Sequence, residues 1–144
     1  MLRVGINGFG RIGRAIFRVN LDNNLFEVVA INDINNDLEN LAYQLNYDTL
    51  YGNLKKQFRV QKDHICCDDF KSRVFHERHI DDVDWKSEEV DIVIDASGIL
   101  DNVIRGHETI KKQNVKKIIV THSPDEVDFT MVLGANESEL DLSR

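Results

Sequence analysis

The feature that most constrains the fold of this chain is a set of three closely spaced glycines between two apolar segments. Gly8, Gly10 and Gly13 form a G-x-G-x-x-G pattern. Residues 2–7 before it are typical of a short buried strand. Residues 11–20 after it have apolar positions at i, i+3, i+4 and i+7, the spacing of an amphipathic helix. A strand, a glycine turn and a helix in this order predict the opening of a βαβ unit.

Each glycine has its own physical reason to be there. We expect Gly8 to permit a tight turn, Gly10 to let the backbone approach a pyrophosphate, and Gly13 to allow close packing of the helix on the strand. The N-terminus of the helix offers unpaired N–H groups and a partial positive charge. We therefore predict that the amides of Arg11 and Ile12 contact the phosphates of a bound dinucleotide.

The first twenty residues contain arginines but no acidic residue, and the arginines are Arg3, Arg11, Arg14 and Arg18. One interpretation is a local positive field for an anionic ligand. The other is that positions 11, 14 and 18 form the solvated stripe of an amphipathic helix. For the side chains beyond Arg11 we expect the second.

The rest of the chain alternates strands with helices. We predict further strands at 26–32, 91–96, 115–120 and 129–133, and helices that begin after the caps Asp37 and Asp101, the second one ending at residue 113. Three β-type stretches, at 58–60, 64–67 and 73–75, interrupt this alternation. The pattern predicts an α/β fold over residues 1–144: a doubly wound, mostly parallel Rossmann sheet with an antiparallel excursion.

A carboxylate follows the second strand at the spacing that a dinucleotide site requires. Asp33 lies twenty positions beyond Gly13, where it would accept hydrogen bonds from the hydroxyls of an adenosine ribose. Its charge would repel a ribose 2′-phosphate by ~1 to 4 kcal/mol, which favours NAD over NADP. A methyltransferase can place a glycine loop and an acid in the same positions, so S-adenosylmethionine is an alternative ligand.

Small polar residues follow the two later strands. Ser97 and Gly98 come directly after the strand at 91–96, and Thr121 comes directly after the strand at 115–120. Ligands of open α/β sheets bind outside the carboxyl ends of the strands, so we expect both loops to line the crevice and both hydroxyls to contact ribose or phosphate oxygens. The alternative for each hydroxyl is ordinary helix-cap or turn chemistry.

Charge, hydropathy and cysteine use argue against several classes of protein. The net charge is −7 and no basic stripe is present, so we expect no nucleic-acid partner. No apolar run approaches the ~20 residues of a membrane span, and no secretory signal is visible. Cys66 and Cys67 are adjacent, which suggests a reducing, cytoplasmic compartment and half-buried strand positions without a catalytic role. His76 and His79 fit no common zinc spacing with these cysteines, so we expect no metal site.

The opening at residues 4–14, VGINGFGRIGR, is the most specific pattern in the sequence. With residues 29–33, 47–49, 95–98 and 134–136 in the same order, it resembles the N-terminal part of the glyceraldehyde-3-phosphate dehydrogenases. The resemblance implies an NAD-binding domain from a glycolytic enzyme that oxidises an aldehyde phosphate and adds inorganic phosphate. It also implies a role for each site residue along the cofactor: Arg11 and Ile12 at the pyrophosphate, Asp33 at the adenosine ribose, Arg78 near the adenine, and Ser97, Gly98 and Thr121 towards the nicotinamide.

The same resemblance implies that the nucleophilic Cys, the general-base His and the substrate-phosphate residues belong to a catalytic domain beyond residue 144. We therefore expect this chain to contain no catalytic residue and to bind NAD without turning over a substrate. A small-molecule substrate and a homotetramer are implied for the complete enzyme. Two alternatives are the N-terminal domain of an erythrose-4-phosphate dehydrogenase and a stand-alone NAD-binding regulatory module.

Overall fold

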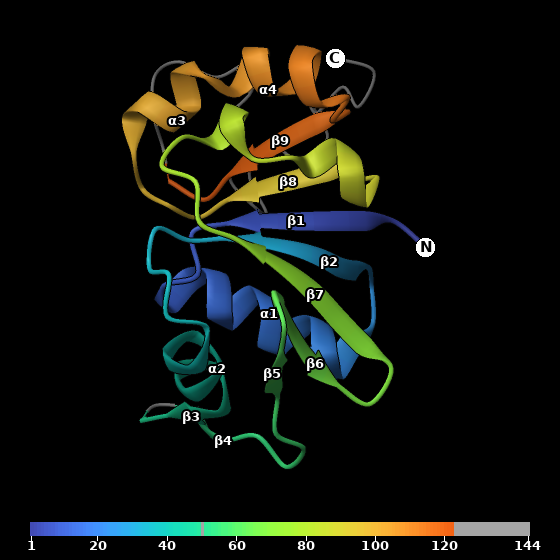
Figure 1. Ribbon diagram of the computed structural model, residues 1–144, viewed down its shortest axis with the longest axis vertical. Coiled ribbons are helices and arrows are strands. Elements are labelled where there is room, and N and C mark those ends of the chain that lie inside the picture. The colour runs from blue at the N-terminus through green and yellow to red at the C-terminus, as the bar shows by residue number, and fades with distance from the viewer. Residues whose placement is uncertain (50, 123–144) are drawn as a thin grey trace, which may run out of the picture.

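A central sheet with helices on both faces organises the chain (Figure 1), as the computed structural model shows for residues 1–49 and 51–122. Its strands are β1 (Arg3–Asn7), β2 (Glu27–Asn32), β5 (Arg59–Gln61), β6 (His64–Cys67), β7 (Phe70–Phe75), β8 (Ile92–Asp95) and β9 (Lys117–Val120). The helices are α1 (Arg11–Asn23), α2 (Leu38–Asn46), α3 (Leu100–Ile104) and α4 (Gly106–Gln113), and two 3-10 helices are η1 (Ile80–Asp82) and η2 (Trp85–Glu88). A separate short antiparallel pair comprises β3 (Tyr47–Asp48) and β4 (Gly52–Asn53).

The sheet order is β5-β6-β7-β2-β1-β8-β9. The strands from β7 to β9 all pair in parallel, whereas β5, β6 and β7 pair antiparallel with one another. Strand β7 is the junction, because Arg73 is in register with His64 of β6 on one side and with Ala30 of β2 on the other. The predicted doubly wound, mostly parallel sheet with an antiparallel excursion is therefore confirmed.

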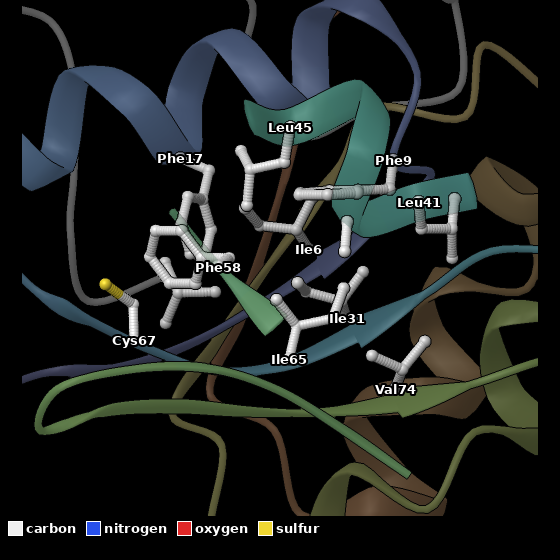
Figure 2. Close-up of a cluster of buried hydrophobic side chains, with 12 residues drawn as sticks. Ile6, Phe9, Phe17, Ile31, Leu41, Leu45, Phe58, Ile65, Cys67 and Val74 are labelled. Atoms are coloured by element: carbon white, nitrogen blue, oxygen red, sulfur yellow. The ribbon is translucent and has the colours of Figure 1, made fainter. Parts of the chain in front are cut away.

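One hydrophobic cluster fills the space between the sheet and helices α1 and α2 (Figure 2). Ile6 and Ile31 enter it from the central strands, and Leu45 enters it from α2. Phe17 of α1 packs edge to face against Phe58, with ring centroids 5.3 Å apart. Such pairs add stabilisation beyond the apolar area that they bury. This cluster holds α1 firmly against the strand that precedes the glycine turn.

A second cluster covers the opposite face of the sheet. Val29 and Val93 point into it from β2 and β8, and Trp85 of η2 is its largest fully buried side chain. The indole N–H of Trp85 donates to the carbonyl of Ile80 at 2.9 Å, so the ring is both buried and satisfied. Burial of both sheet faces explains why the central strands have continuous apolar runs.

The helix limits differ from the sequence expectation in two places. Helix α1 continues to Asn23, three residues beyond its predicted end. The helix predicted at 101–113 is instead two helices that meet at Arg105. Asp101 is not its cap, because the chain enters α3 at Ile99 and the Asp101 carboxylate bonds Arg105 Nε at 2.8 Å. The predicted cap Asp37 is confirmed, since it accepts a bond from the backbone N of Asn40.

The strand predicted at 129–133 lies outside the described residues. In the described part of the chain, no helix has the length and the apolar character that crossing a membrane requires.

The antiparallel excursion is fastened to α2 by one buried side chain, and this gives a test of the packing. Asn46 Nδ2 donates to the carbonyl of Phe58 at 2.9 Å, and Asn46 Oδ1 accepts from the Phe58 N–H at 2.7 Å. Asn46→Ala would leave both backbone groups unpaired in the core, so we expect the free energy of unfolding to fall by ~2 to 4 kcal/mol in urea denaturation. The exposed Asn53→Ala is the control. A loss below ~0.5 kcal/mol for Asn46→Ala would contradict this account.

Candidate dinucleotide-binding site

The glycine turn, residues 8–10, follows β1 directly and is sterically constrained. Gly8 has φ +93°, a conformation that side chains disfavour, and its N–H donates to the carbonyl of Asn32 at 2.7 Å. A Cβ at Gly8 would lie 2.7 Å from the Cα of Ser97. The loop after β8 therefore packs so closely against the turn that only glycine fits at position 8.

The other two glycines of the motif have opposite surroundings. A Cβ at Gly13 would collide with the carbonyl oxygen of Gly8 and lie 3.2 Å from Ile6 Cγ2. A Cβ at Gly10 would meet no atom within 4 Å. The packing expected for Gly13 and the open space expected for Gly10 are thus both present. Contact of Gly10 with a cofactor stays a prediction.

The first turn of α1 is open to an anion. Gly10 occupies the N-cap position without a side-chain cap bond, and the first turn contains no acidic residue. Arg11 and Ile12, the predicted phosphate contacts, are both exposed there. An α-helix leaves its first N–H groups unpaired and carries a partial positive charge at this end. Helix α1 therefore presents amides and positive potential where the pattern predicts a pyrophosphate.

Asp33 is held at the glycine turn by the backbone. Its Oδ2 accepts the N–H of Phe9 at 2.7 Å, and its Oδ1 accepts the N–H of Asn35 at 2.9 Å. The Asp33 side chain is half-buried at the carboxyl end of β2. Each carboxylate oxygen keeps a second lone pair, so the group can still accept bonds from ribose hydroxyls. The structure brings Asp33 and the glycine turn together.

Two arginines of α1 do not lie on a solvated stripe, contrary to the expectation. Arg14 and Arg18 are half-buried, whereas Arg11 is exposed. Arg14 Nη1 donates to the carbonyl of Phe9 at 2.9 Å, and Arg18 Nη2 donates to the carbonyl of Leu45 at 2.7 Å. Helix α2 packs beside this face of α1, so the side chains fold back onto backbone carbonyls rather than into water.

A chain of buried polar side chains crosses the ends of the three central strands. Asn7 and Asn32 are in register, as are Asn7 and Asp95. Asn32 Nδ2 donates to Asn7 Oδ1 at 2.8 Å, and Asn7 Nδ2 donates to Asp95 Oδ1 at 3.1 Å. Asn32 also makes two bonds to the backbone of Glu77, which places the segment after β7. This network was not predicted from the sequence, although a polar residue ends each of these apolar strands.

The hydroxyl of the half-buried Ser97 makes several hydrogen bonds within the protein. Its Oγ donates to Asp95 Oδ1 at 2.7 Å and accepts from the N–H of Ile99 and from Asn102 Nδ2. A hydroxyl has one proton and two lone pairs, so these bonds use all of its capacity. The predicted hydroxyl contact of Ser97 with a cofactor therefore conflicts with the geometry. Its backbone N–H also donates to Asp95 Oδ1, at 3.2 Å.

The remaining predicted residues line the same edge of the sheet. Gly98 is exposed with φ +70°, and a Cβ there would meet no atom within 4 Å. Thr121 is exposed after β9, and its N–H donates to the carbonyl of Asp95 at 3.1 Å. Arg78 is exposed between β7 and η1, next to the Glu77 backbone that Asn32 holds. These residues follow the carboxyl ends of β8, β9 and β7, and these strand ends face left in Figure 1.

The cysteines lie away from the carboxyl ends of the parallel strands, since Cys67 pairs with Phe70 at the start of β7. Cys66 and Cys67 are buried in β6, and Cys67 belongs to the cluster of Figure 2. They are more deeply buried than the half-buried positions that we expected. Burial raises the pKa of the Cys67 thiol, and Asp68 raises it further. A raised pKa disfavours the reactive thiolate.

The histidines lie near carbonyl and carboxylate oxygens. The ring Nδ1 of His76 is 3.2 Å from the Asp33 carbonyl, and that of His79 is 3.4 Å from Asp101 Oδ2. Within residues 1–49 and 51–122, no three His, Cys, Asp or Glu side chains are grouped so that they could hold a metal ion.

Two hollows flank the outer face of α1, one of about 450 Å³ and one of about 610 Å³. Ala15, Val19 and Tyr51 line both of them. Neither is lined by Gly10, Asp33 or Ser97, although Arg11 and Ile12 line the smaller one, which therefore adjoins the start of α1. The predicted site residues follow the carboxyl ends of parallel strands, which is where dinucleotides bind in open α/β sheets.

The parallel sheet, the glycine turn at α1 and the fixed carboxylate after β2 define a dinucleotide-binding Rossmann domain. Residues 2–103 match the family described as "Glyceraldehyde 3-phosphate dehydrogenase, NAD binding domain". The chain belongs to this family. The predicted cofactor, NAD, is thereby confirmed, and the alternative of S-adenosylmethionine is excluded.

Similar proteins support the same assignment over nearly the whole chain. The chain is 40% identical over 141 residues to "Glyceraldehyde-3-phosphate dehydrogenase 2" of Streptomyces avermitilis, which covers 97% of this chain and 42% of the relative. It is 35% identical over 141 residues to "Glyceraldehyde-3-phosphate dehydrogenase 1" of Bacillus cereus, with coverages of 98% and 42%. It is 38% identical over 141 residues to the Streptomyces coelicolor enzyme, with coverages of 97% and 41%. The chain thus spans about 42% of the length of the first of these relatives.

The buried polar network predicts a specific consequence of removing Asn32. Asn32→Ala would delete its bonds to Asn7 and Glu77, and we expect the free energy of unfolding to fall by ~2 to 3 kcal/mol because buried partners lose their bonds. We also expect faster hydrogen exchange at the Glu77 amide, measured by NMR. The exposed Asn36→Ala in the next loop should change neither quantity. Unchanged protection of the Glu77 amide in Asn32→Ala would contradict the network.

Proposed function

We propose that this chain is the cofactor-holding part of an enzyme that oxidises glyceraldehyde 3-phosphate, adds inorganic phosphate, and reduces NAD. The observation that carries the proposal is the open N-terminus of α1 beside Gly10, facing a carboxylate that the backbone fixes at Asp33. The family to which the chain belongs suggests this class of reaction. The substrate, a small aldehyde phosphate, would meet residues of the complete enzyme that lie beyond this chain.

The residues present fit NAD. The first turn of α1 can receive the pyrophosphate, since it has neither a side-chain cap nor an acid. Asp33 keeps lone pairs for the hydroxyls of the adenosine ribose, and its charge disfavours a 2′-phosphate. Arg78 is exposed after β7, where we propose that it lies near the adenine. The backbone of Gly98 and the hydroxyl of Thr121 can contact the half that carries the nicotinamide. When bound, NAD supplies the ring that accepts a hydride.

The chain's own residues bind and orient, and we propose that they do not catalyse. A dehydrogenase of this class needs a thiolate to attack the aldehyde and a base to manage the proton. Both cysteines of the chain are buried in β6, away from the carboxyl ends of the parallel strands, and burial raises the pKa of Cys67. Neither can serve as the nucleophile.

The assembly and the cellular location are part of the same proposal. We infer a homotetramer for the complete enzyme, by analogy with the family. We also propose a cytoplasmic location, by analogy with the glycolytic enzymes of the family.

Calorimetric titration with NAD and NADP tests the cofactor site. We expect saturable NAD binding and an NADP affinity lower by about tenfold or more, because the Asp33 charge repels a 2′-phosphate. Asp33→Asn keeps the size of the side chain and removes the charge, so the preference for NAD should shrink. Asp22→Asn removes a charge near the far end of α1 and should leave the preference unchanged. A folded chain that does not bind NAD would overturn the proposed function.

Turnover is a separate test. The purified chain should produce no NADH when glyceraldehyde 3-phosphate, inorganic phosphate and NAD are supplied together, because no accessible thiolate is available. NADH fluorescence is the readout, and a commercially prepared enzyme of this family is the positive control. NADH formation that disappears when Cys66 and Cys67 are replaced by Ser would contradict a purely cofactor-holding role.

A further inference from the structure

Phe9 is held by side chains on both sides of its backbone. Its N–H donates to Asp33 Oδ2 at 2.7 Å, and its carbonyl accepts from Arg14 Nη1 at 2.9 Å. The two holding groups come from different elements, the loop after β2 and the body of α1. Two consecutive peptide planes of the glycine turn, Gly8–Phe9 and Phe9–Gly10, are therefore fixed independently.

The orientation of one peptide plane decides what the turn offers to a ligand. In a trans peptide the carbonyl of one residue and the N–H of the next point in opposite directions. Because Arg14 holds the Phe9 carbonyl, the N–H of Gly10 is turned away from Arg14. Gly10 is exposed with open space around it, and it begins α1. The amide that Arg14 orients is thus the first N–H at the helix end that receives the pyrophosphate.

Further contacts and burial hold the Arg14 side chain beside the Phe9 carbonyl. Its Nη1 is also 3.4 Å from Gln44 Oε1 of α2, and its Nε is buried without a partner among the described residues. Burial lowers the pKa of the guanidinium below its usual value, against the opposing charges of Asp48 and Asp33. The side chain nevertheless stays charged at neutral pH, since an arginine does not lose its proton in proteins. Burial removes water from Nε. The shorter of the two hydrogen bonds of Nη1 is the one to the Phe9 carbonyl.

We propose that Arg14 is a positioning residue of the cofactor site: it orients the Phe9–Gly10 peptide so that the Gly10 amide faces the pyrophosphate, without itself touching NAD. The inference rests on the proposed NAD site. Any arginine near the turn would supply positive charge. The role proposed for Arg14 is different, because it depends on the hydrogen bond to the Phe9 carbonyl.

Arg18 provides a matched control. It lies one turn further along α1, is also half-buried, and also donates to a backbone carbonyl, that of Leu45 in α2. Replacement of Arg14 or Arg18 by Met removes the same charge and one bridge between a helix arginine and a carbonyl. Only the Arg14 change affects the glycine turn.

The ligand-free chain gives the first readout. In Arg14→Met we expect displaced NMR resonances at Gly10 and Arg11, and hydrogen exchange at the Phe9 amide faster by about tenfold, because the turn is then held from one side only. Arg18→Met should leave these resonances unchanged, and Arg14→Lys, which keeps the charge and a donor, should restore protection in part. Arg14→Lys also serves if the Met variant does not fold. Unchanged Phe9 protection in the Arg14 variants overturns the proposal whether or not NAD binds.

Binding gives the second readout. We expect the Kd for NAD and for ADP to rise about tenfold in Arg14→Met, and the Kd for adenosine, which lacks phosphates, to stay within about twofold. Arg18→Met should change none of the three. Equal losses for adenosine and ADP would show a general structural defect and overturn the positioning role. Failure of the wild-type chain to bind NAD, together with a loss of Phe9 amide protection in Arg14→Met, would overturn the proposed function and leave the orientation of the turn supported.

Discussion

The central strands of this sheet end in polar side chains that are buried, and the pairing of these side chains determines where the loops of the site lie. Asn7 of β1 stands between Asn32 of β2 and Asp95 of β8 and bonds both. These bonds offset the cost of burying amide and carboxylate groups, although Asp95 Oδ2 has no partner among the described residues, and they hold the three strand ends in one register. From this row, Asn32 reaches Glu77 and Asp95 reaches Ser97, and the loops after β7 and β8 follow.

The glycine turn is fixed against this row from several directions. The loop at Ser97 presses on Gly8, Asp33 bonds the Phe9 amide, and Gly13 brings α1 against the Gly8 carbonyl. The protein thus uses its own hydrogen bonds to immobilise the turn, and it leaves the first amides of α1 and the remaining lone pairs of Asp33 for a ligand. A site arranged in advance in this way loses little conformational entropy on binding. Rigidity here is the means by which a short exposed segment can bind a charged, extended molecule.

The sequence predicts the parts of this structure that depend on local pattern. Periodic apolar positions identified the strands and α1, the glycine spacing predicted the surroundings of Gly10 and Gly13, and Asp37 was identified as a helix cap. Features that depend on distant partners were missed or wrong. Asp101 was expected to cap a helix, but Arg105 and His79 engage its carboxylate. The expectation that Arg14 and Arg18 face solvent was wrong because α2 covers one face of α1. The periodicity of a single helix does not show such a neighbour.

Ser97 illustrates the same limit inside the site. Its backbone lies against Gly8 of the glycine turn, but position alone does not show how a hydroxyl uses its bonds. Asn102 and Asp95 take up that capacity from one helix and one strand, and Asp95 in turn bonds Asn7, which is 88 residues away in sequence. The polar network therefore becomes visible only when the three strands are assembled.

The central claim is that NAD lies across the strand ends with its pyrophosphate at the start of α1. The most direct test is an NMR titration of the ¹⁵N-labelled chain with NAD, followed at each backbone amide. The account predicts that the largest shifts fall on Gly10, Arg11 and Ile12, with further shifts at Asp33 and Gly98. Shifts concentrated instead at Ala15, Val19 and Tyr51, which line the hollows on the outer face of α1, would contradict it.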